Sequence, residues 1–302
     1  MKIFKIGKND EGQRLDKFLS RLMADYPMSH IYKSLRKKKV KVNSKRITDG
    51  AYRLVMGDIL ELYISDEYFS SAPQNYNWMD SGDELKIVYE DEHIIIADKP
   101  SGLLSQSDDE DSLEGRIRKY LYNKGEFNPK EENSFIPSLC HRIDRNTKGL
   151  VIGAKDMPAL RTINEKIRLR EIRKFYLLET QGTPSPIKGE ISGWLEKDSA
   201  KRKMILKKNE VSGGVFCKTL YRVLKEGSTA LVEAELLTGR THQIRAGFSA
   251  IGTPLKGDVK YGAKKDGKTE FQHLTAYKLI FDFKDNNGCL DYLKGKEFTT
   301  TG

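Results

Sequence analysis

The chain has 302 residues and a net charge of +10, with 38% hydrophobic and 32% charged residues. This length is typical of two domains and is ample for a buried core. No run of about 18 apolar residues is present, and the first residues lack the apolar core of a secretory signal, so the sequence predicts neither a membrane span nor a leader.

The first 65 residues carry most of the excess charge, with ten Lys and five Arg against seven Asp and Glu, a net charge of +8. The apolar residues of 14–23 recur at helical spacing and predict an amphipathic helix. Ser29 is expected to cap a second helix that ends in the basic run 36–39. Alternating apolar residues then predict strands at 40–42 and 58–64.

Two segments of this basic region resemble the S4 RNA-binding domain. They are Arg-Leu-Asp-Lys-Phe-Leu at 14–19 and Lys-Val-Lys-Val-Asn-Ser-Lys-Arg at 39–46, and the resemblance covers residues 12–64. It implies phosphate contacts, which give affinity and position without reading the base sequence. The basic side chains expected on one side of this domain are Arg36, Lys37, Lys38, Lys41, Lys45 and Arg46.

Residues 65–82 have no apolar period and carry three acidic residues, which predicts a linker. Its aromatic residues suggest that parts of it dock on a domain surface. From residue 83 to 302 short apolar runs predict strands, at 85–89, 94–97, 175–179, 215–224, 230–236 and within 274–283.

Helices are expected at 156–172 and 239–251, with Thr241 as a candidate N-cap of the second, and the tail after Asp291 is expected to be loosely held. Sequential strands with two or three helices predict an α+β domain on a mixed, mainly antiparallel sheet flanked by helices.

The segment 141–150, His-Arg-Ile-Asp-Arg-Asn-Thr-Lys-Gly-Leu, places Asp144 between two guanidiniums, just before an apolar run. A carboxylate near Arg stays ionised because the opposite charge favours the charged form. Electrostatics alone would favour a solvated turn residue. The whole pattern, however, closely resembles the signature of the large bacterial family of RNA pseudouridine synthases, which implies the α+β fold of that family.

Further segments resemble motifs of the same family. Gly-Arg-Thr-His-Gln-Ile-Arg at 239–245 is the strongest, and Lys-Pro-Ser-Gly at 99–102, Arg-Lys-Phe-Tyr at 173–176, the glycine-rich 254–262 and 273–276 also match. Without the resemblance, Tyr176 would be interpreted as a core aromatic residue of a strand, and the basic segment at 239–245 as the exposed start of a helix. The stretch 254–262 is expected to be structural.

The resemblance implies a role for each matching residue. Asp144 is the catalytic carboxylate, Tyr176 stacks on the target base and Arg245 pairs with the carboxylate. The side chains implied to contact the substrate RNA are His141, Arg142, Lys174, Arg240 and His242. For Arg142 a structural salt bridge is an equally open alternative to filling the space of a flipped base.

The implied reaction is isomerisation of uridine to pseudouridine in RNA, which requires no cofactor and no metal. The sequence agrees, since Cys140, Cys217 and Cys289 lack metal-ligand spacing and no phosphate-binding glycine loop is present. The same cysteine usage favours a reducing cytoplasm. Whether Asp144 attacks C1′ as a nucleophile or acts as a base at the ribose stays open.

Large-subunit (23S) ribosomal RNA is the expected partner, bound by a monomer, with transfer RNA as the alternative substrate. Two other functional classes of protein are alternatives. A non-catalytic RNA-binding protein is disfavoured because Asp144, Tyr176 and Arg245 are all present. A glycoside-cleaving hydrolase normally has a second carboxylate across the scissile bond, and no motif supplies one.

Overall fold

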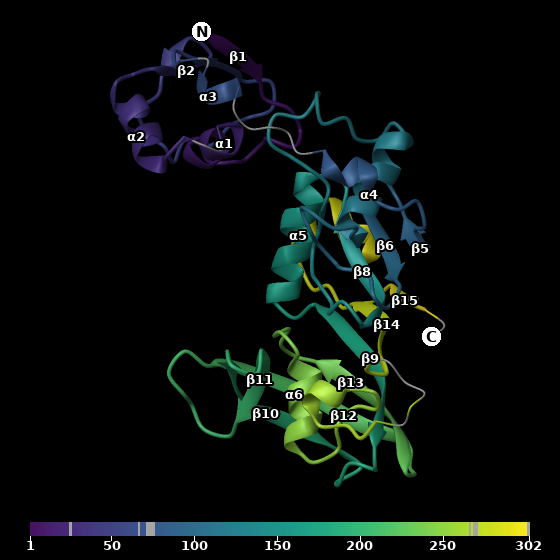
Figure 1. Cartoon of the computed structure of the whole chain (residues 1–302). Coiled ribbons are helices and arrows are strands. Elements are labelled where there is room, and N and C mark those ends of the chain that lie inside the picture. The colour runs from purple at the N-terminus through teal and green to yellow at the C-terminus, as the bar shows by residue number, and fades with distance from the viewer. Residues whose placement is uncertain (24–25, 66, 71–75, 266, 268–270, 301–302) are drawn as a thin grey trace.

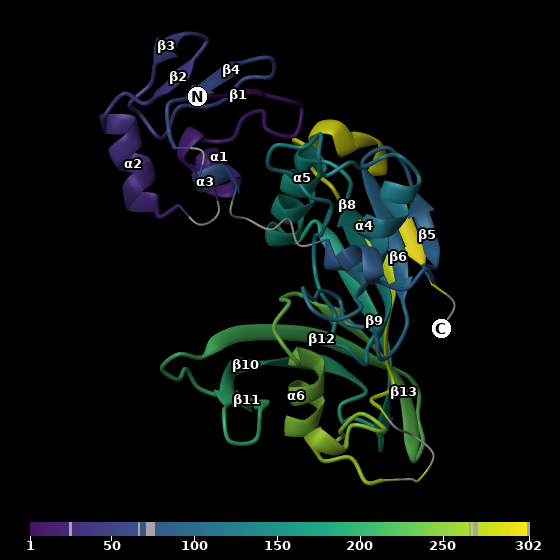
Figure 2. The same ribbon diagram turned by 45° about the horizontal axis from the view of Figure 1, so that its top comes forward.

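The computed structural model describes residues 1–23, 26–65, 67–70, 76–265, 267 and 271–300. The chain forms a small N-terminal domain and a larger body that consists of two lobes (Figures 1 and 2). No helix of the described ranges is both long and apolar enough to cross a bilayer.

The small domain packs two helices on a four-stranded sheet of order β1-β4-β2-β3. Its elements are β1 (Lys2–Lys5), α1 (Leu15–Leu22), α2 (Met28–Arg36), β2 (Val40–Val42), β3 (Lys45–Arg46) and β4 (Ile59–Leu62). The apolar faces predicted for 14–23 and for the second helix form its core, where Phe18, Leu35 and Leu60 are fully buried. Both predicted helices and both predicted strands are confirmed.

Two details of the small domain differ from the sequence-based expectations. The second helix starts at Met28, after Pro27, so Ser29 lies inside its first turn and is not the N-cap. Proline has a fixed φ suited to a helix start and lacks the N–H that would need a partner there. Strand β1 was not predicted. It lies before residue 12, where the predicted domain begins, and it pairs with β4.

The segment between the two parts carries α3 (Glu67–Ser70) and the 3₁₀ helix η1 (Asn77–Asp80). Tyr68 and Phe69 pack on the core of the small domain, whereas Trp78 packs in the body against Tyr122 and Phe127. Its aromatic residues therefore dock on both parts, as predicted. The predicted boundaries, 12–64 and 83–302 with 65–82 between them, stay predictions.

The body is built on an eleven-stranded sheet within the described residues. Its path runs β11-β10-β12-β13-β9-β14-β8-β6-β5, while β15 pairs with β14 and β7 with β8. All pairs are antiparallel except β14 with β8, which confirms the mixed, mainly antiparallel sheet. The strands are β5 (Ile87–Glu90), β6 (Ile94–Lys99), β7 (Ser138–Leu139), β8 (Lys148–Ala154), β9 (Ile172–Gln181), β10 (Lys188–Asp198), β11 (Lys203–Lys207), β12 (Val215–Lys225), β13 (Thr229–Leu236), β14 (Leu274–Phe281) and β15 (Glu297–Thr299).

Strands β6 and β8 are buried on both faces, which explains why they read as continuous apolar runs. Ile94 and Ile96 face the core under α5 (Met157–Arg168), while Ile95 and Ala97 face the core under α4 (Leu113–Asn123). Helix α4 was not predicted. Ser112 caps its N-terminus by accepting a hydrogen bond from the Gly115 N–H.

Three of the sequence-based expectations for the body need correction. Helix α5 ends at Arg168, earlier than the predicted 172, because Arg170 has a φ of 63° and β9 begins at Ile172. Helix α6 (Gln243–Ala250) is capped by His242 in a left-handed conformation and not by Thr241.

The third correction concerns the tail. The 3₁₀ helix η3 (Gly288–Leu293) buries Leu290 and Leu293, and β15 pairs with β14. Up to residue 300 the tail is therefore part of the sheet and core, because its apolar residues pack with those of α5 and β14.

Candidate active site

The loop that carries Asp144, between β7 and β8, is held by the segment that follows β6. Ser105 Oγ donates to the Ile143 carbonyl at 2.7 Å and accepts from the Ile143 N–H at 3.2 Å. Lys99 is fully buried, and its Nζ donates to the carbonyls of Pro100, Leu103 and Arg145. These bonds satisfy buried backbone acceptors and fix the position of Asp144.

Gly149 follows this loop because no other residue fits where β8 meets β14. Its φ is +117°, and a Cβ on it would lie 2.2 Å from the Ala276 carbonyl oxygen. The glycine thus allows the close parallel pairing that brings the Asp144 loop beside β14 and β9.

Arg245 on α6 connects two carboxylates. Its Nη1 donates to Asp144 Oδ2 at 3.2 Å, while Nε and Nη2 donate to Asp258 at 2.7 and 2.8 Å. Arg245 and Asp258 are 8% and 2% exposed, so the bidentate pair is held away from solvent. Burial acts to lower the pKa of Arg245, but the bonds to Asp258 and Asp144 outweigh it and raise the pKa. Arg245 is therefore a fixed cation beside Asp144.

His242 approaches the same oxygen of the Asp144 carboxylate. Its Nε2 is 3.9 Å from Asp144 Oδ2, and its Nδ1 is 2.8 Å from the Tyr261 hydroxyl. The Tyr261 ring also lies under the Arg245 guanidinium, 4.8 Å from its centroid. Burial lowers the pKa of His242, against the opposing charge of Asp144, so this ring favours the neutral form.

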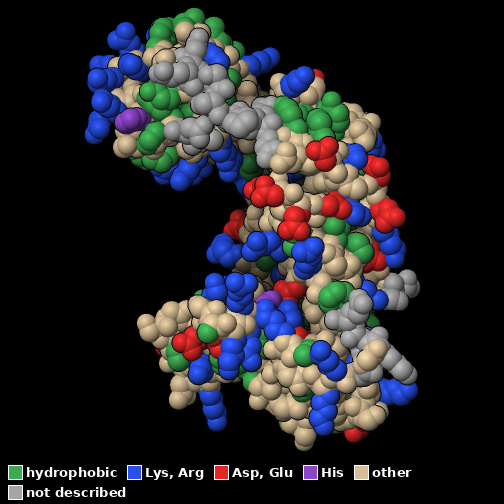
Figure 3. Space-filling view, in the orientation of Figure 1, with side chains coloured by type: hydrophobic (Ala, Val, Ile, Leu, Met, Phe, Trp, Pro, Cys, Tyr) green, Lys and Arg blue, Asp and Glu red, His purple; other side chains and the backbone are tan. Residues whose placement is uncertain are grey.

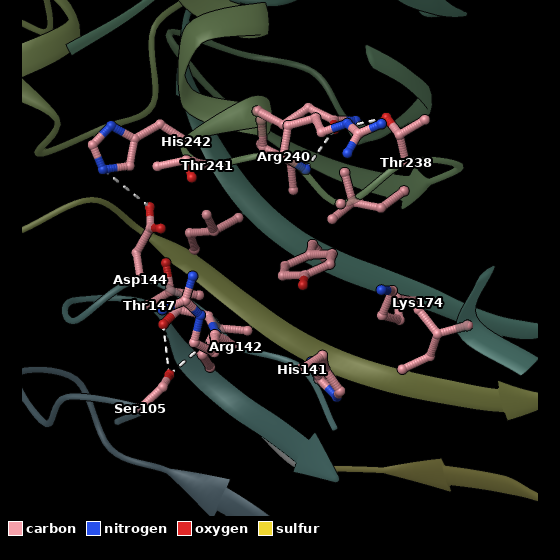
Figure 4. A pocket seen from close by; sticks show the side chains of 18 of the residues that line it. Ser105, His141, Arg142, Asp144, Thr147, Lys174, Thr238, Arg240, Thr241 and His242 are labelled. Carbon is pink, nitrogen blue, oxygen red and sulfur yellow. Dashed lines mark hydrogen bonds and ion pairs between the residues drawn. The ribbon is translucent and has the colours of Figure 1, made fainter. Parts of the chain in front are cut away.

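A cavity of about 720 Å³ opens around Asp144 between the two lobes. Every residue predicted for catalysis or substrate contact lines it: Asp144, Tyr176, Arg245, His141, Arg142, Lys174, Arg240 and His242. They come from four separate segments, namely the loop before β8, β9, the turn before α6, and α6 itself. Figure 4 shows His242 facing Asp144, with Arg142 on the same side and Lys174 and His141 at the other end.

Tyr176 is 5% exposed and contributes to both the core and the cavity wall. Burial raises the pKa of its phenol, and the negative charge of Asp144 raises it further. The phenol is therefore neutral, and the ring offers an uncharged aromatic surface next to the carboxylate.

Two of the predicted substrate-binding residues at the far end of the cavity have other surroundings. His141 Nε2 accepts a hydrogen bond from the Ile152 N–H at 3.2 Å, so this nitrogen faces β8. Burial and the charge of Lys174 lower the pKa of His141 to about 3. Burial also lowers the pKa of Lys174. By contrast, Arg142 is exposed and no carboxylate of the described residues lies within ion-pair distance of it, which argues against the structural salt bridge.

Sequence reasoning missed the residues that support this site. Asp258 and Tyr261 belong to the segment 254–262, which was recognised as a motif but interpreted as a structural loop. Gln243, which is 3% exposed, was also missed; it accepts from the Arg240 N–H and binds Thr238 and Lys218. A buried acid within a glycine-rich motif was the signal that could have revealed the partner of Arg245.

The basic residues predicted for the small domain lie at its surface. Arg36, Lys37, Lys38, Lys45 and Arg46 are exposed. Lys41 differs because it is half-buried, and its Nζ donates to the Tyr63 hydroxyl at 2.9 Å beside Glu61. Lys41 therefore has less freedom to contact a phosphate than the other five. Lys and Arg gather on this domain and along the concave side of the molecule (Figure 3).

One group of described residues has donor atoms close enough for a metal ion, His93, Asp156 and Cys289, outside the cavity. Asp156 caps α5 through the Ala159 N–H, binds His93 Nδ1 and lies 3.3 Å from Lys8 Nζ. Its oxygens are thus occupied, and the neighbouring ammonium disfavours a second cation.

Comparisons with known proteins agree with this architecture. A family model of RNA pseudouridylate synthase matches residues 93–250, and a model of the S4 domain matches residues 13–60. The chain is 33% identical over 295 residues to an uncharacterized RNA pseudouridine synthase of Mycoplasma capricolum, across 97% of this chain and 95% of the relative.

Two further relatives connect the chain to named proteins. It is 32% identical over 265 residues to the ribosomal large subunit pseudouridine synthase C of Rickettsia bellii, across 83% of each. The solved structure of human RNA pseudouridylate synthase domain containing 4 shares the fold, with a TM-score of 0.55 at 22% identity, over 72% of this chain and 88% of that one.

The fold and the site together define an RNA-modifying enzyme with an S4 domain. The chain belongs to the RNA pseudouridine synthase family, whose members are isomerases.

Proposed function

We propose that this enzyme converts uridine to pseudouridine in large-subunit (23S) ribosomal RNA, with Asp144 as the catalytic carboxylate. The observation that carries the assignment to Asp144 is the way its carboxylate is held. Oδ2 contacts Arg245, whereas no hydrogen bond from a described residue reaches Oδ1 in the cavity. One oxygen is thus anchored and the other is available to the substrate.

This arrangement suits the chemistry of isomerisation. The bond from ribose C1′ to uracil N1 breaks, the base turns, and a bond from C1′ to C5 forms. A free carboxylate oxygen can attack C1′ or take a proton from the ribose, and in either route Arg245 holds the carboxylate in place through its other oxygen. The proton on C5 leaves at the end and the same carboxylate can accept it, while N1, which has lost its bond to C1′, takes up one proton, so that no atom is gained or lost.

The neighbours of Asp144 have matching roles in this proposal. The Tyr176 ring stacks on the uracil, a flipped base being held by an aromatic side chain. Arg142 is exposed at the cavity and has no ion-pair partner among the described residues, which suits filling the gap that the flipped base leaves. Arg240, His242, Lys174 and His141 surround the remainder of the nucleotide.

The preference for ribosomal RNA is supported by the relative from Rickettsia bellii, which is named for the large ribosomal subunit. The S4 domain supports it too, since exposed basic side chains bind structured RNA through phosphates. The cavity is lined by residues of one chain, so we propose a monomer as the active form, acting in the cytoplasm without a cofactor.

Mapping pseudouridines in ribosomal and transfer RNA from cells with and without this gene tests the proposal. We expect a small number of large-subunit positions to lose pseudouridine. Loss confined to transfer RNA would move the substrate assignment, and no loss in either RNA would overturn it.

A further inference from the structure

The small domain and the body meet at a polar junction that is separate from the active-site cavity. Asp10, 1% exposed, accepts hydrogen bonds from Asn133 Nδ2 and Ser134 Oγ, both at 2.7 Å. Gln13, 4% exposed, donates to Ser134 Oγ at 3.0 Å. Asn9 Oδ1 accepts from the Met157 N–H at the start of α5. These buried bonds fix residues 9–13 against the body.

Three arginines from different elements converge on this fixed segment. Arg161 of α5 donates to the Glu11 carbonyl at 2.8 Å, and Arg53 donates to the Gly12 carbonyl at 2.7 Å. Arg21, near the end of α1, donates to Gln13 Oε1 at 2.8 Å. Two arginines therefore come from the small domain and one from the body, and they bind three consecutive residues.

The three guanidiniums are close together and have no acidic partner. No carboxylate of the described residues lies within ion-pair distance of any of them. Desolvation, together with the charges of Arg21 and Arg53, lowers the pKa of Arg161, as expected for crowded like charges. All three side chains are exposed, and each uses one of its five N–H donors in these bonds.

Arg53 and Arg161 also approach the same residue. Gly12 accepts from Arg53, and a Cβ added at Gly12 would lie 3.2 Å from Arg161 Nη1. Gly12 has a φ of +70°, so glycine is favoured there for its backbone as well. Both guanidiniums therefore lie beside Gly12, and each keeps N–H donors that can bind a phosphate oxygen.

The junction is connected to the active site by α5. Arg161 and Arg168 are seven residues apart, which places them on one face of the helix about 10 Å apart. Arg168, Arg170 and Arg173 line the cavity that holds Asp144. Figures 1 and 2 show the small domain beside the upper end of α5, and Figure 3 shows Lys and Arg together with Asp and Glu along this concave side.

We propose that Arg21, Arg53 and Arg161 form a composite phosphate-binding site at the domain junction, in which Arg53 and Arg161 share one phosphate of the RNA. The strand leaving this site follows α5 to the active-site cavity. RNA thereby contacts both domains at once, as one continuous surface. The S4 domain binds the substrate in the same docked orientation in which it packs against the body here. This inference rests on the proposed function for the identity of the polyanion.

Salt-dependent binding of an unmodified large-subunit ribosomal RNA transcript tests the site. Each lost phosphate contact reduces the slope of log affinity against log salt by about 0.7 to 0.9. We expect Arg161→Gln to reduce it by nearly one such step and Arg161→Lys to retain most of it. The control, Lys225→Gln, removes the same charge from the exposed C-terminal end of β12 and leaves the slope unchanged.

Sharing of one phosphate makes a second prediction. The double variant Arg53→Gln/Arg161→Gln should lose less affinity than the sum of the two single variants, because the first loss already removes part of the shared contact. Additive losses would overturn the shared phosphate. An Arg161→Gln slope equal to that of the parent, or equal losses for the Gln and Lys variants, would overturn the site.

The same preparations separate this inference from the proposed function. Pseudouridine formation on the transcript reports on the function, whereas the salt slopes report on the junction. A parent chain that makes pseudouridine while Arg161→Gln binds normally would overturn only the junction site. A parent chain with the expected slopes but no product would overturn only the reaction.

Discussion

The active-site cavity and the basic surface of the S4 domain both gather charged residues, but they hold them differently. Beside Asp144 the charge of Arg245 is fixed by a buried partner, in the bidentate pair with Asp258. On the S4 domain, the side chains of Lys37, Lys38 and Lys45 are exposed and form no hydrogen bond or ion pair with a described residue. Chemistry needs one geometry, whereas phosphate binding needs only sufficient positive charge. Substitutions in the two regions should therefore fail in different ways.

Asp144→Asn should give the largest effect. The amide can neither attack C1′ nor take a proton, so turnover should fall by at least about a thousandfold, the scale of losing a group that acts in the transition state. RNA affinity and fold should be retained because the side chains are nearly equal in size. Single-turnover pseudouridine formation measures this, and a loss of less than tenfold would remove Asp144 from the catalytic role.

Asp258→Asn tests how much the rate depends on the buried partner of Arg245, which does not itself touch Asp144, the proposed catalytic carboxylate. It removes the charge that orients Arg245, so we expect single-turnover rates to fall by about a hundredfold, the cost of a small misplacement of reacting groups. Arg245→Lys is the matched variant, since an ammonium keeps the charge but cannot donate to both carboxylates in the same geometry.

Both of these variants should bind RNA almost normally. If affinity falls while the rate at saturating RNA is unchanged, Arg245 is a phosphate contact, and the contrast between the two regions is lost.

Replacing Lys37, Lys38 and Lys45 with Gln should have a smaller effect, which appears in RNA affinity and not in the rate. The slope of log affinity against log salt should become shallower by two to three units, at about 0.9 for each neutralised phosphate on a duplex. The rate at saturating RNA should be unchanged because the cavity is untouched. Lys41→Gln is a useful comparison, since its pairing with Tyr63 and Glu61 predicts a weaker effect. An unchanged slope for the triple variant would show that this surface does not bind RNA.

Replacing His141 should give the smallest effect. It appears in the pH dependence of the free energy of unfolding. Its pKa of about 3 in the folded protein lies below the ordinary value near 6.5, so the unfolded chain binds more protons between these values. Its contribution to stability is present above pH 6.5 and is lost as the pH falls towards 3. His141→Gln should flatten acid unfolding in this window, as followed by circular dichroism. An unchanged acid profile would mean that His141 is not held in its neutral form.

The sequence determined the local elements and the candidates for the reacting groups. Apolar spacing was sufficient to predict α1, α2, α5 and several of the strands, although not β10 or β11, because burial of one face follows directly from the order of residues. The motifs around Asp144 and Arg245 were readable in the same way, and the family comparisons support that interpretation. Elements without a strong pattern were missed, such as β1, whose edge position leaves half of its residues exposed.

Only the tertiary structure decided how these groups meet. Asp144 and Arg245 lie 101 residues apart in sequence, and Asp258 completes the pair from a loop that looked structural. The S4 domain docks on the body through the hydrogen bond between Asp10 and Ser134, which lie 124 residues apart in sequence. From the sequence, only the linker at 65–82 was expected to connect the two parts. Local patterns encode which face of an element is buried. The partners of a buried charge depend instead on which elements pack together, so they become visible only when the chain is folded.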